Sequence, residues 1–238
     1  MSKEKKSKKE STATGGDVPN LPHRIFFVRH GETDWNRSFR FQGASDVELN
    51  ATGLEQARSV ALRLARIKPS RVFTSPLIRA RRTAEIIMER NDGDSPITPC
   101  EDIREISFGV WEGLTVSQVE ERDPETLRVW RKAPFDGSPS GGERMTEVVH
   151  RSRRVSDMIK SGSGGDVTFV VAHGAVLRAL LSVMMDIDDM DVMWRMRLDN
   201  CSVTILDMWR RIPSLLLLND THHVRLSEND ISLLSFPD

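Results

Sequence analysis

The sequence predicts an α/β fold of three layers, in which a mostly parallel central sheet carries helices on both faces. Two observations lead to this prediction. Short apolar runs alternate with segments whose apolar residues recur at helical spacing, an order typical of parallel sheets covered by helices. The 238 residues also suit one α/β domain. We expect this single domain to span residues 21–238.

Residues 1–20 precede this pattern and have a different composition. They are rich in lysine, then in serine, threonine and glycine, and contain almost nothing apolar. Such a segment cannot bury enough surface to fold, so we predict a disordered tail. A basic anchor for a membrane or for RNA is disfavoured, because Glu4 and Glu10 interrupt the lysines.

Six short apolar runs are the predicted strands. The first is "RIFFVR" at residues 24–29, and the second is "RVFTSP", which ends at Pro76. The remaining four are residues 97–100, 167–172, 201–209 and 214–220. Each of the first two is followed by a helical pattern, which favours parallel pairing.

Four helices are predicted from apolar residues that recur every three or four positions. Their apolar stripes are Leu54, Ala57, Ala61 and Leu64; Ala80, Ala84, Ile87 and Met88; Val148, Val149, Val155 and Ile159; and the run at residues 175–185. Residues 101–141 mix turns with short helices, and Pro124 and Pro134 interrupt them.

The composition excludes several classes of protein. Basic and acidic residues number 34 and 35, so the chain has no overall positive field for nucleic acid. Cys100 and Cys201 are far apart, which disfavours a disulfide framework or a thiolate metal site. The longest apolar stretch, residues 176–185, is too short to span a bilayer, and no signal-peptide core is present. We therefore expect a cytoplasmic protein without nucleic-acid or membrane partners.

Two of the predicted strands end in the same way. "FFVRHG" and "FVVAHG" place His30-Gly31 and His173-Gly174 directly after a buried strand. The carboxyl ends of parallel strands open onto the binding crevice of an α/β sheet. If the two strands are neighbours, both imidazoles enter one pocket. Glycine after each histidine would let backbone N–H groups approach an anion.

Arginines accompany these histidines. Arg29 adjoins His30, and Arg79 falls in the first turn of the helix that follows the second strand. The planar guanidinium group suits phosphate oxygens, and a helix N-terminus adds positive potential. The set describes a site for a small dianion, whereas Arg81 and Arg82 are interpreted as surface charges. No glycine-rich nucleotide-binding motif is present.

The motifs together resemble the histidine phosphatase superfamily, also called the phosphoglycerate mutase-like family. The resemblance spans about residues 24–224 and depends on several stretches in the family's order. These are "RHGETDWN", "FQGASDVELNATGLEQA", "TSPLIRARRTAE", "REISFGVWEG", "SGGER" and "VVAHGAVLRALL". "GGER" departs from the pattern, since Arg144 stands where serine is common.

The resemblance implies a role for each matching residue. His30 is the nucleophile that becomes a phosphohistidine, and Glu105 is the proton donor to the leaving group. The phosphate-binding residues are Arg29, Arg79, His173, Asn36 and Gly174. Gln42 and Gly43 border the substrate. Arg104 and Glu112 are left out of the chemistry and interpreted as solvated or structural.

No cofactor or metal is implied by the resemblance. A metal site built from His30, Glu32, His173 and His222 or His223 is the alternative, and it is disfavoured because the arginines would repel a cation. Physically, a neutral histidine can attack phosphorus near pH 7, and fixed cations stabilise the charge of the transferring group.

Two activities fit this chemistry, and a scaffold without activity is a third possibility. The mutases of the family have a long insertion between the glutamate motif and the "GGE" motif, and here Gly113 and Gly141 lie close in sequence. We therefore predict a metal-independent phosphomonoesterase of the phosphatase branch, acting on a small phosphorylated metabolite. Phosphoglycerate mutase-type phosphoryl transfer and a catalytically silent scaffold remain the alternatives.

The substrate itself is not predicted. The apolar residues after the glutamate motif suit either a lid over the pocket or packing; they are Trp111, Val116, Val119, Leu127, Trp130 and Phe135. A second apolar group is interpreted as packing, although its spacing also suits a homodimer face; it consists of Met193, Trp194, Met196 and Leu198.

Overall fold

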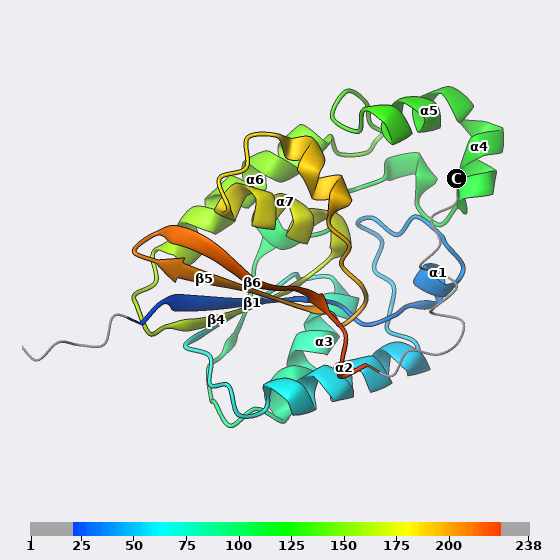
Figure 1. Ribbon diagram of the computed structural model, residues 1–238. Coiled ribbons are helices and arrows are strands. Elements are labelled where there is room, and N and C mark those ends of the chain that lie inside the picture. Colours follow the sequence, from blue (N-terminus) through cyan, green and yellow to red (C-terminus); the bar gives the residue numbers. More distant parts are fainter. Residues whose placement is uncertain (1–20, 225–238) are drawn as a thin grey trace, which may run out of the picture.

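One six-stranded sheet forms the middle layer of the molecule (Figure 1). The computed structural model describes residues 21–224, apart from the side chains of residues 190 and 191. The strand order is β3-β2-β4-β1-β5-β6. The predicted tail, residues 1–20, lies outside the described residues, as do residues 225–238.

The strands are parallel in one part of the sheet and antiparallel in the other. The four parallel strands are β1 (His23–Arg29), β2 (Arg71–Thr74), β3 (Ile97–Pro99) and β4 (Val167–Ala172). The last two strands, β5 (Val203–Trp209) and β6 (Ile212–Asp220), form an antiparallel hairpin against β1. Arg210 and Arg211 form its turn, both with positive φ. The predicted α/β class with a mostly parallel sheet is confirmed.

Helices cover both faces of this sheet, as predicted (Figure 1). On one face lie α2 (Ala51–Leu64) and α3 (Ile78–Glu89), and on the other lie α6 (Met145–Lys160) and α7 (Gly174–Met184). Side chains alternate across β1, so that Ile25 and Phe27 pack under α6 and α7 while Phe26 and Val28 pack under α2 and α3. Two cores therefore sandwich the strands.

The stretch between β3 and α6 consists of turns and short helices, as predicted for residues 101–141. They are η1 (Glu101–Ile103), η2 (Gly109–Trp111), α4 (Val116–Arg122) and α5 (Pro124–Lys132). Pro124 opens α5 at its first position, where a missing N–H costs nothing. Two further elements are α1 (Asp34–Arg37) after β1 and η3 (Met190–Arg195) after α7.

The sequence left open whether two groups of apolar residues form a lid, a dimer face or part of the core, and most of their members pack in the core. Trp111, Val119 and Leu127 are buried in a third, smaller core beside the sheet. Met193, Met196 and Leu198 are buried in the main core, so they do not form an exposed face. In the part of the chain that the structure describes, no helix has the length and apolarity needed to cross a membrane.

Candidate active site

The two strand-end histidines meet because β1 and β4 are neighbours in register. Arg29 pairs with Ala172 across the parallel ladder, so His30 and His173 leave the sheet at the same level. Their ring centroids are 5.0 Å apart, and both side chains are buried. The expected neighbouring of the two strands brings the imidazoles together, but of the two only His30 lines the cavity described below.

His30 is held in one orientation and one tautomer. Its Nδ1 donates to the carbonyl oxygen of Gly31 over 2.6 Å, which leaves Nε2 with its lone pair. Burial, followed by the nearby Arg79 and Arg29, holds the pKa of His30 well below its usual value. The imidazole is therefore neutral near pH 7, as a nucleophile must be. Asn200 fixes the backbone by donating to the His30 carbonyl over 2.9 Å.

The glycine after His30 is required by packing. A Cβ at Gly31 would lie 2.5 Å from the carbonyl oxygen of Gly53, at the start of α2. The Gly31 N–H donates to Thr83 within the protein. Gly31 is therefore needed for close packing against α2, whereas the sequence led us to expect that it lets backbone N–H groups approach an anion. At Gly174 a Cβ would meet only Arg29 and Glu105 at 3.7 Å or more, so that side is open toward the site.

Arg79 lies at the start of α3 and is almost completely buried. Its two terminal nitrogens donate to the carbonyl oxygens of Ser45 and Gly43, over 2.7 and 2.8 Å. Burial lowers the pKa of Arg79 to about 10, so it stays charged at neutral pH. The Nε atom has no hydrogen-bond partner. The same holds for Arg29, whose Nη1 donates to Leu198 O over 2.7 Å.

Glu105 lies at the N-terminal end of α7. Its carboxylate accepts from the backbone amides of Ala175 and Val176, each over 3.2 Å. His173 precedes the same helix, and its Nε2 hydrogen-bonds to Ser75 over 2.7 Å. Burial, with Arg79 as the next cause, holds the pKa of His173 well below its usual value. The start of α7 therefore fixes both groups beside Arg29.

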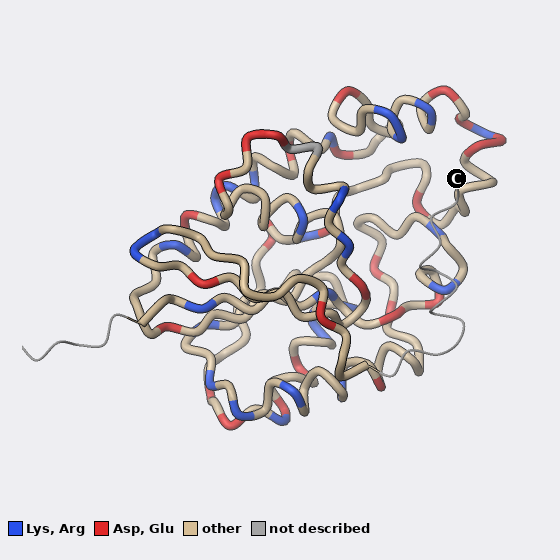
Figure 2. Tube along the Cα trace, viewed as in Figure 1, with Lys and Arg blue, Asp and Glu red and all other residues tan. Residues whose placement is uncertain are grey.

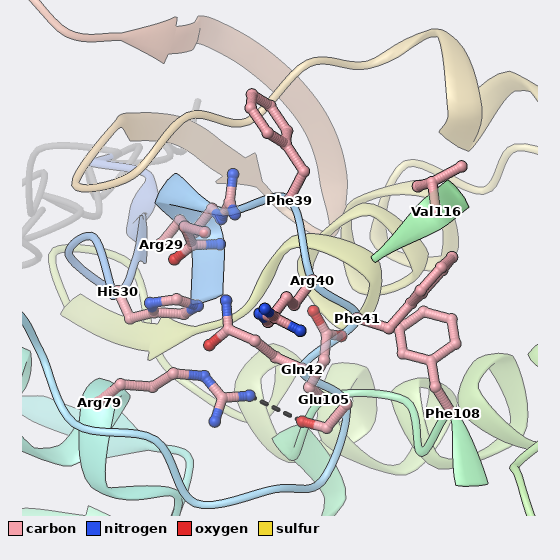
Figure 3. A pocket seen from close by; sticks show the side chains of 12 residues that line it. Arg29, His30, Phe39, Arg40, Phe41, Gln42, Arg79, Glu105, Phe108 and Val116 are labelled. Atoms are coloured by element: carbon pink, nitrogen blue, oxygen red, sulfur yellow. Dashed lines mark hydrogen bonds between the residues drawn. The ribbon is translucent and has the colours of Figure 1, made fainter. Parts of the chain in front are cut away.

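These groups surround a cavity of about 270 Å³. Figure 3 shows Arg29, His30 and Arg79 on one side of it, with Glu105 and Gln42 opposite and phenylalanines at the far end. Seven of the nine predicted site residues line it; they are Arg29, His30, Asn36, Gln42, Gly43, Arg79 and Glu105. His173 and Gly174 are not part of the lining. His173 packs directly against His30 instead.

Several lining residues were missed by sequence reasoning. Phe39, Arg40 and Phe41 immediately precede Gln42, and that proximity was the available signal. No sequence signal identified Phe108 as a lining residue, because it comes from the irregular stretch after Glu105. Val116, proposed as part of a lid, does line the cavity and is 37% exposed. Ser75 and Asn200 were missed because they act on the histidines from distant segments.

Glu112 has the structural role expected of it. It accepts from the backbone amides of Ala44 and Phe108, and from the hydroxyl of Ser45. Gly43, in the loop it holds, has φ of +57°, a conformation that favours glycine. Glu112 thereby fixes the loop that carries the acceptors of Arg79. Arg104 is exposed and pairs with Glu101.

The alternative metal site is not assembled. His223 hydrogen-bonds to Cys201 O, and Glu32 accepts from Asn50 and Arg37. Among residues 21–224, no group of three or more His, Cys, Asp or Glu side chains is placed to hold a metal ion. Basic and acidic positions are interspersed along the trace (Figure 2).

A model of the histidine phosphatase superfamily (branch 1) matches residues 25–221. The chain belongs to this superfamily. Phosphoserine phosphatase 1 of Hydrogenobacter thermophilus is 30% identical over 201 residues, which cover 84% of this chain and 94% of that protein. The probable phosphoglycerate mutase GpmB of Serratia proteamaculans is 35% identical over 188 residues, covering 77% and 84%.

A solved structure supports the same assignment. The mycobacterial glucosyl-3-phosphoglycerate phosphatase complexed with VO3 is 30% identical to this chain, with a TM-score of 0.74. The match covers 83% of this chain and 99% of that one. The predicted superfamily, fold and enzyme class, a phosphoric monoester hydrolase, are confirmed by these findings.

Proposed function

We propose that this superfamily member is a metal-independent phosphomonoesterase that hydrolyses a small phosphorylated metabolite through a phosphohistidine at His30. One observation carries the proposal. A neutral imidazole, oriented by the carbonyl oxygen of Gly31, lines a pocket beside two arginines that have no carboxylate partner among the described residues. That arrangement suits attack on a dianionic phosphoryl group.

In the first step, His30 Nε2 attacks phosphorus and the bond from phosphorus to the ester oxygen breaks. Arg29 and Arg79 hold the phosphoryl oxygens, since both arginines line the cavity beside His30. We also assign to the phosphate site Asn36, which lines the cavity, together with His173 and Gly174, which lie next to His30 and Arg29 outside the lining. Glu105 gives its proton to the leaving alkoxide, because an unprotonated alkoxide is a poor leaving group.

In the second step, water attacks the phosphohistidine. Glu105, now a carboxylate, takes a proton from that water as the bond between phosphorus and nitrogen breaks. Inorganic phosphate leaves, and His30 returns to its neutral form. General acid–base help of this kind is typically worth ~10²–10⁴-fold in rate. Every proton is thus accounted for without a metal-bound hydroxide.

Mutase-type transfer is the second candidate, and the GpmB relative favours it. A mutase passes the phosphoryl group to another substrate hydroxyl and must exclude water. In this chain the segment between Glu105 and Gly141 holds only the single turn η2 and the short helices α4 and α5. The limited cover over the pocket supports hydrolysis. A cytoplasmic location, and the absence of nucleic-acid and membrane partners, stay predictions.

The test is turnover of p-nitrophenyl phosphate in the presence of a chelator, by the wild type and by His30→Ala. We expect release of phosphate by the wild type alone, and a trapped label on His30 after brief exposure to labelled substrate. Phosphate moved between hydroxyls with little release would favour the mutase. No turnover at any pH from acid to neutral would favour a silent scaffold.

A further inference from the structure

The cavity contains a third arginine that the mechanism does not use. Arg40 lines it together with Arg29 and Arg79. Its Nη1 donates to the carbonyl oxygen of Gly113 over 2.6 Å and to the side-chain oxygen of Gln118 over 3.4 Å. Both acceptors are uncharged, and among residues 21–224 no carboxylate pairs with Arg40.

Partly buried arginines outside the cavity are of two kinds: Arg151 pairs with Glu143, whereas Arg71 donates to the carbonyl oxygens of Met158 and Ile159. The cavity differs from these places because three arginines meet around one pocket. The three cavity arginines donate only to neutral oxygens. Leaving a half-buried guanidinium without a counterion is costly unless a ligand supplies the anion.

The formal charges of the lining side chains indicate how many negative charges a ligand in the cavity can carry. Its charged side chains are three arginines and Glu105, since His30 is neutral. When Glu105 holds the proton that it donates in the proposed mechanism, the lining carries three positive charges. A phosphoryl dianion balances two of them. Within the lining itself one positive charge then remains, while Asp46 and Glu112 act on Arg79, and Asp199 on Arg29, from outside the lining.

The position of Arg40 indicates where a second anionic group would lie. In Figure 3 its guanidinium points into the cavity, between the phosphate end and the wall formed by Phe41 and Phe108. This is the side on which the leaving alcohol must sit, because Arg29, Arg79 and His30 occupy the other. A planar guanidinium with free donors matches a carboxylate.

We propose that Arg40 determines specificity by binding a carboxylate on the alcohol part of the substrate. The inference rests on the proposed function and adds a substrate contact to it. A charge-assisted hydrogen bond of this kind changes binding by roughly tenfold to a hundredfold. Arg40 also anchors Gly113 and the start of α4, and that structural role would affect all substrates equally.

The experiment compares kcat/KM for 3-phosphoglycerate and glycerol 3-phosphate, which differ by a carboxylate in place of a CH₂OH group. The wild type should prefer 3-phosphoglycerate by at least about tenfold. Arg40→Met should bring this ratio close to one, mostly through KM. Arg58→Met, which removes an exposed arginine from α2, is the matched control and should leave the ratio unchanged.

Each outcome decides a different claim. Equal losses on both substrates in Arg40→Met, with the ratio preserved, would mean that Arg40 is only structural. If Arg40→Met does not fold, Arg40→Gln keeps a donor for Gly113 without the charge and gives the same readout. A wild type that hydrolyses p-nitrophenyl phosphate but does not prefer 3-phosphoglycerate overturns this inference and leaves the phosphatase intact. No turnover of any ester overturns the proposed function itself.

Discussion

Replacing Glu112 by alanine should lower both the stability of the protein and its activity, although Glu112 does not line the cavity. The carboxylate accepts four hydrogen bonds, at 2.9 Å from the amides of Ala44 and Phe108, and at 2.5 and 3.2 Å from the hydroxyls of Ser45 and Ser107. Hydrogen bonds to a charged group contribute ~1.5–3 kcal/mol each where they are buried. Because this carboxylate is only half-buried, we expect a total loss of about 3 kcal/mol.

The substitution should also lower kcat/KM, because it changes the position of Arg79. Its two acceptors, Ser45 O and Gly43 O, lie in the loop that Glu112 holds. A displacement of about 1 Å in a positioning group can reduce activity by ~10²-fold. We therefore expect Glu112→Ala to lower kcat/KM on p-nitrophenyl phosphate by roughly a hundredfold, and Glu112→Gln, which keeps the shape, by less than about tenfold.

The assay measures kcat/KM well below the unfolding temperature, together with thermal unfolding. A loss of about 3 kcal/mol corresponds to a fall in Tm of ~6–12 °C for a domain of this size. Glu121→Ala, an exposed change on α4, is the control and should alter neither quantity. If Glu112→Ala loses stability while kcat/KM stays at the wild-type value, the coupling between this loop and Arg79 does not exist.

Three further predictions follow from the histidines and glycines. Burial lowers the pKa of four histidines below the usual 6.5; they are His23, His30, His173 and His223. Because the unfolded chain then binds protons more readily than the folded one, the stability present above about pH 6.5 is lost as the pH falls. The loss is up to ~1.4 kcal/mol per pH unit for each histidine. Urea unfolding should give a lower free energy at pH 5.5 than at pH 7.5, and an equal or higher value would contradict the sign. Ser75→Ala, which frees His173 Nε2, should lower kcat about tenfold while costing only ~1 kcal/mol, and an unchanged kcat would show that His173 needs no fixing. Gly53→Ala should destabilise the protein by more than about 2 kcal/mol in denaturant titrations, because the new Cβ would overlap the Glu32 carbonyl; wild-type stability would mean that the backbone yields there.

The parallel part of the fold could be predicted because its signals are local. Each of β1, β2 and β4 is one apolar run, and the helices between them show clear periodicity. The ends of these strands also located His30, His173 and Arg79, since parallel strands that neighbour one another end on one side of the sheet. Asn36, Gln42, Gly43 and Glu105 came from the family resemblance alone.

The rest depends on contacts between distant segments. Ser75 and His173 are 98 positions apart, and Arg40 and Gly113 are 73 apart, and neither pair leaves a periodic pattern. The stretch after Glu105 is built from turns whose hydrogen bonds, as at Glu112, involve loop atoms. The packing role of Gly31 was missed for the same reason, because its neighbour Gly53 belongs to another element.

Strand β1 pairs with β4 residue for residue from Arg24 to Arg29, so the length of each strand sets the height of the histidine that follows it. One residue added to or removed from either strand would turn that imidazole to the opposite face of the sheet. The segments around the cavity mouth, from α4 to α5, are under no such constraint. The chain can therefore gain or lose residues at the mouth, and so remodel which molecules enter, while the ladder keeps the reacting atoms aligned.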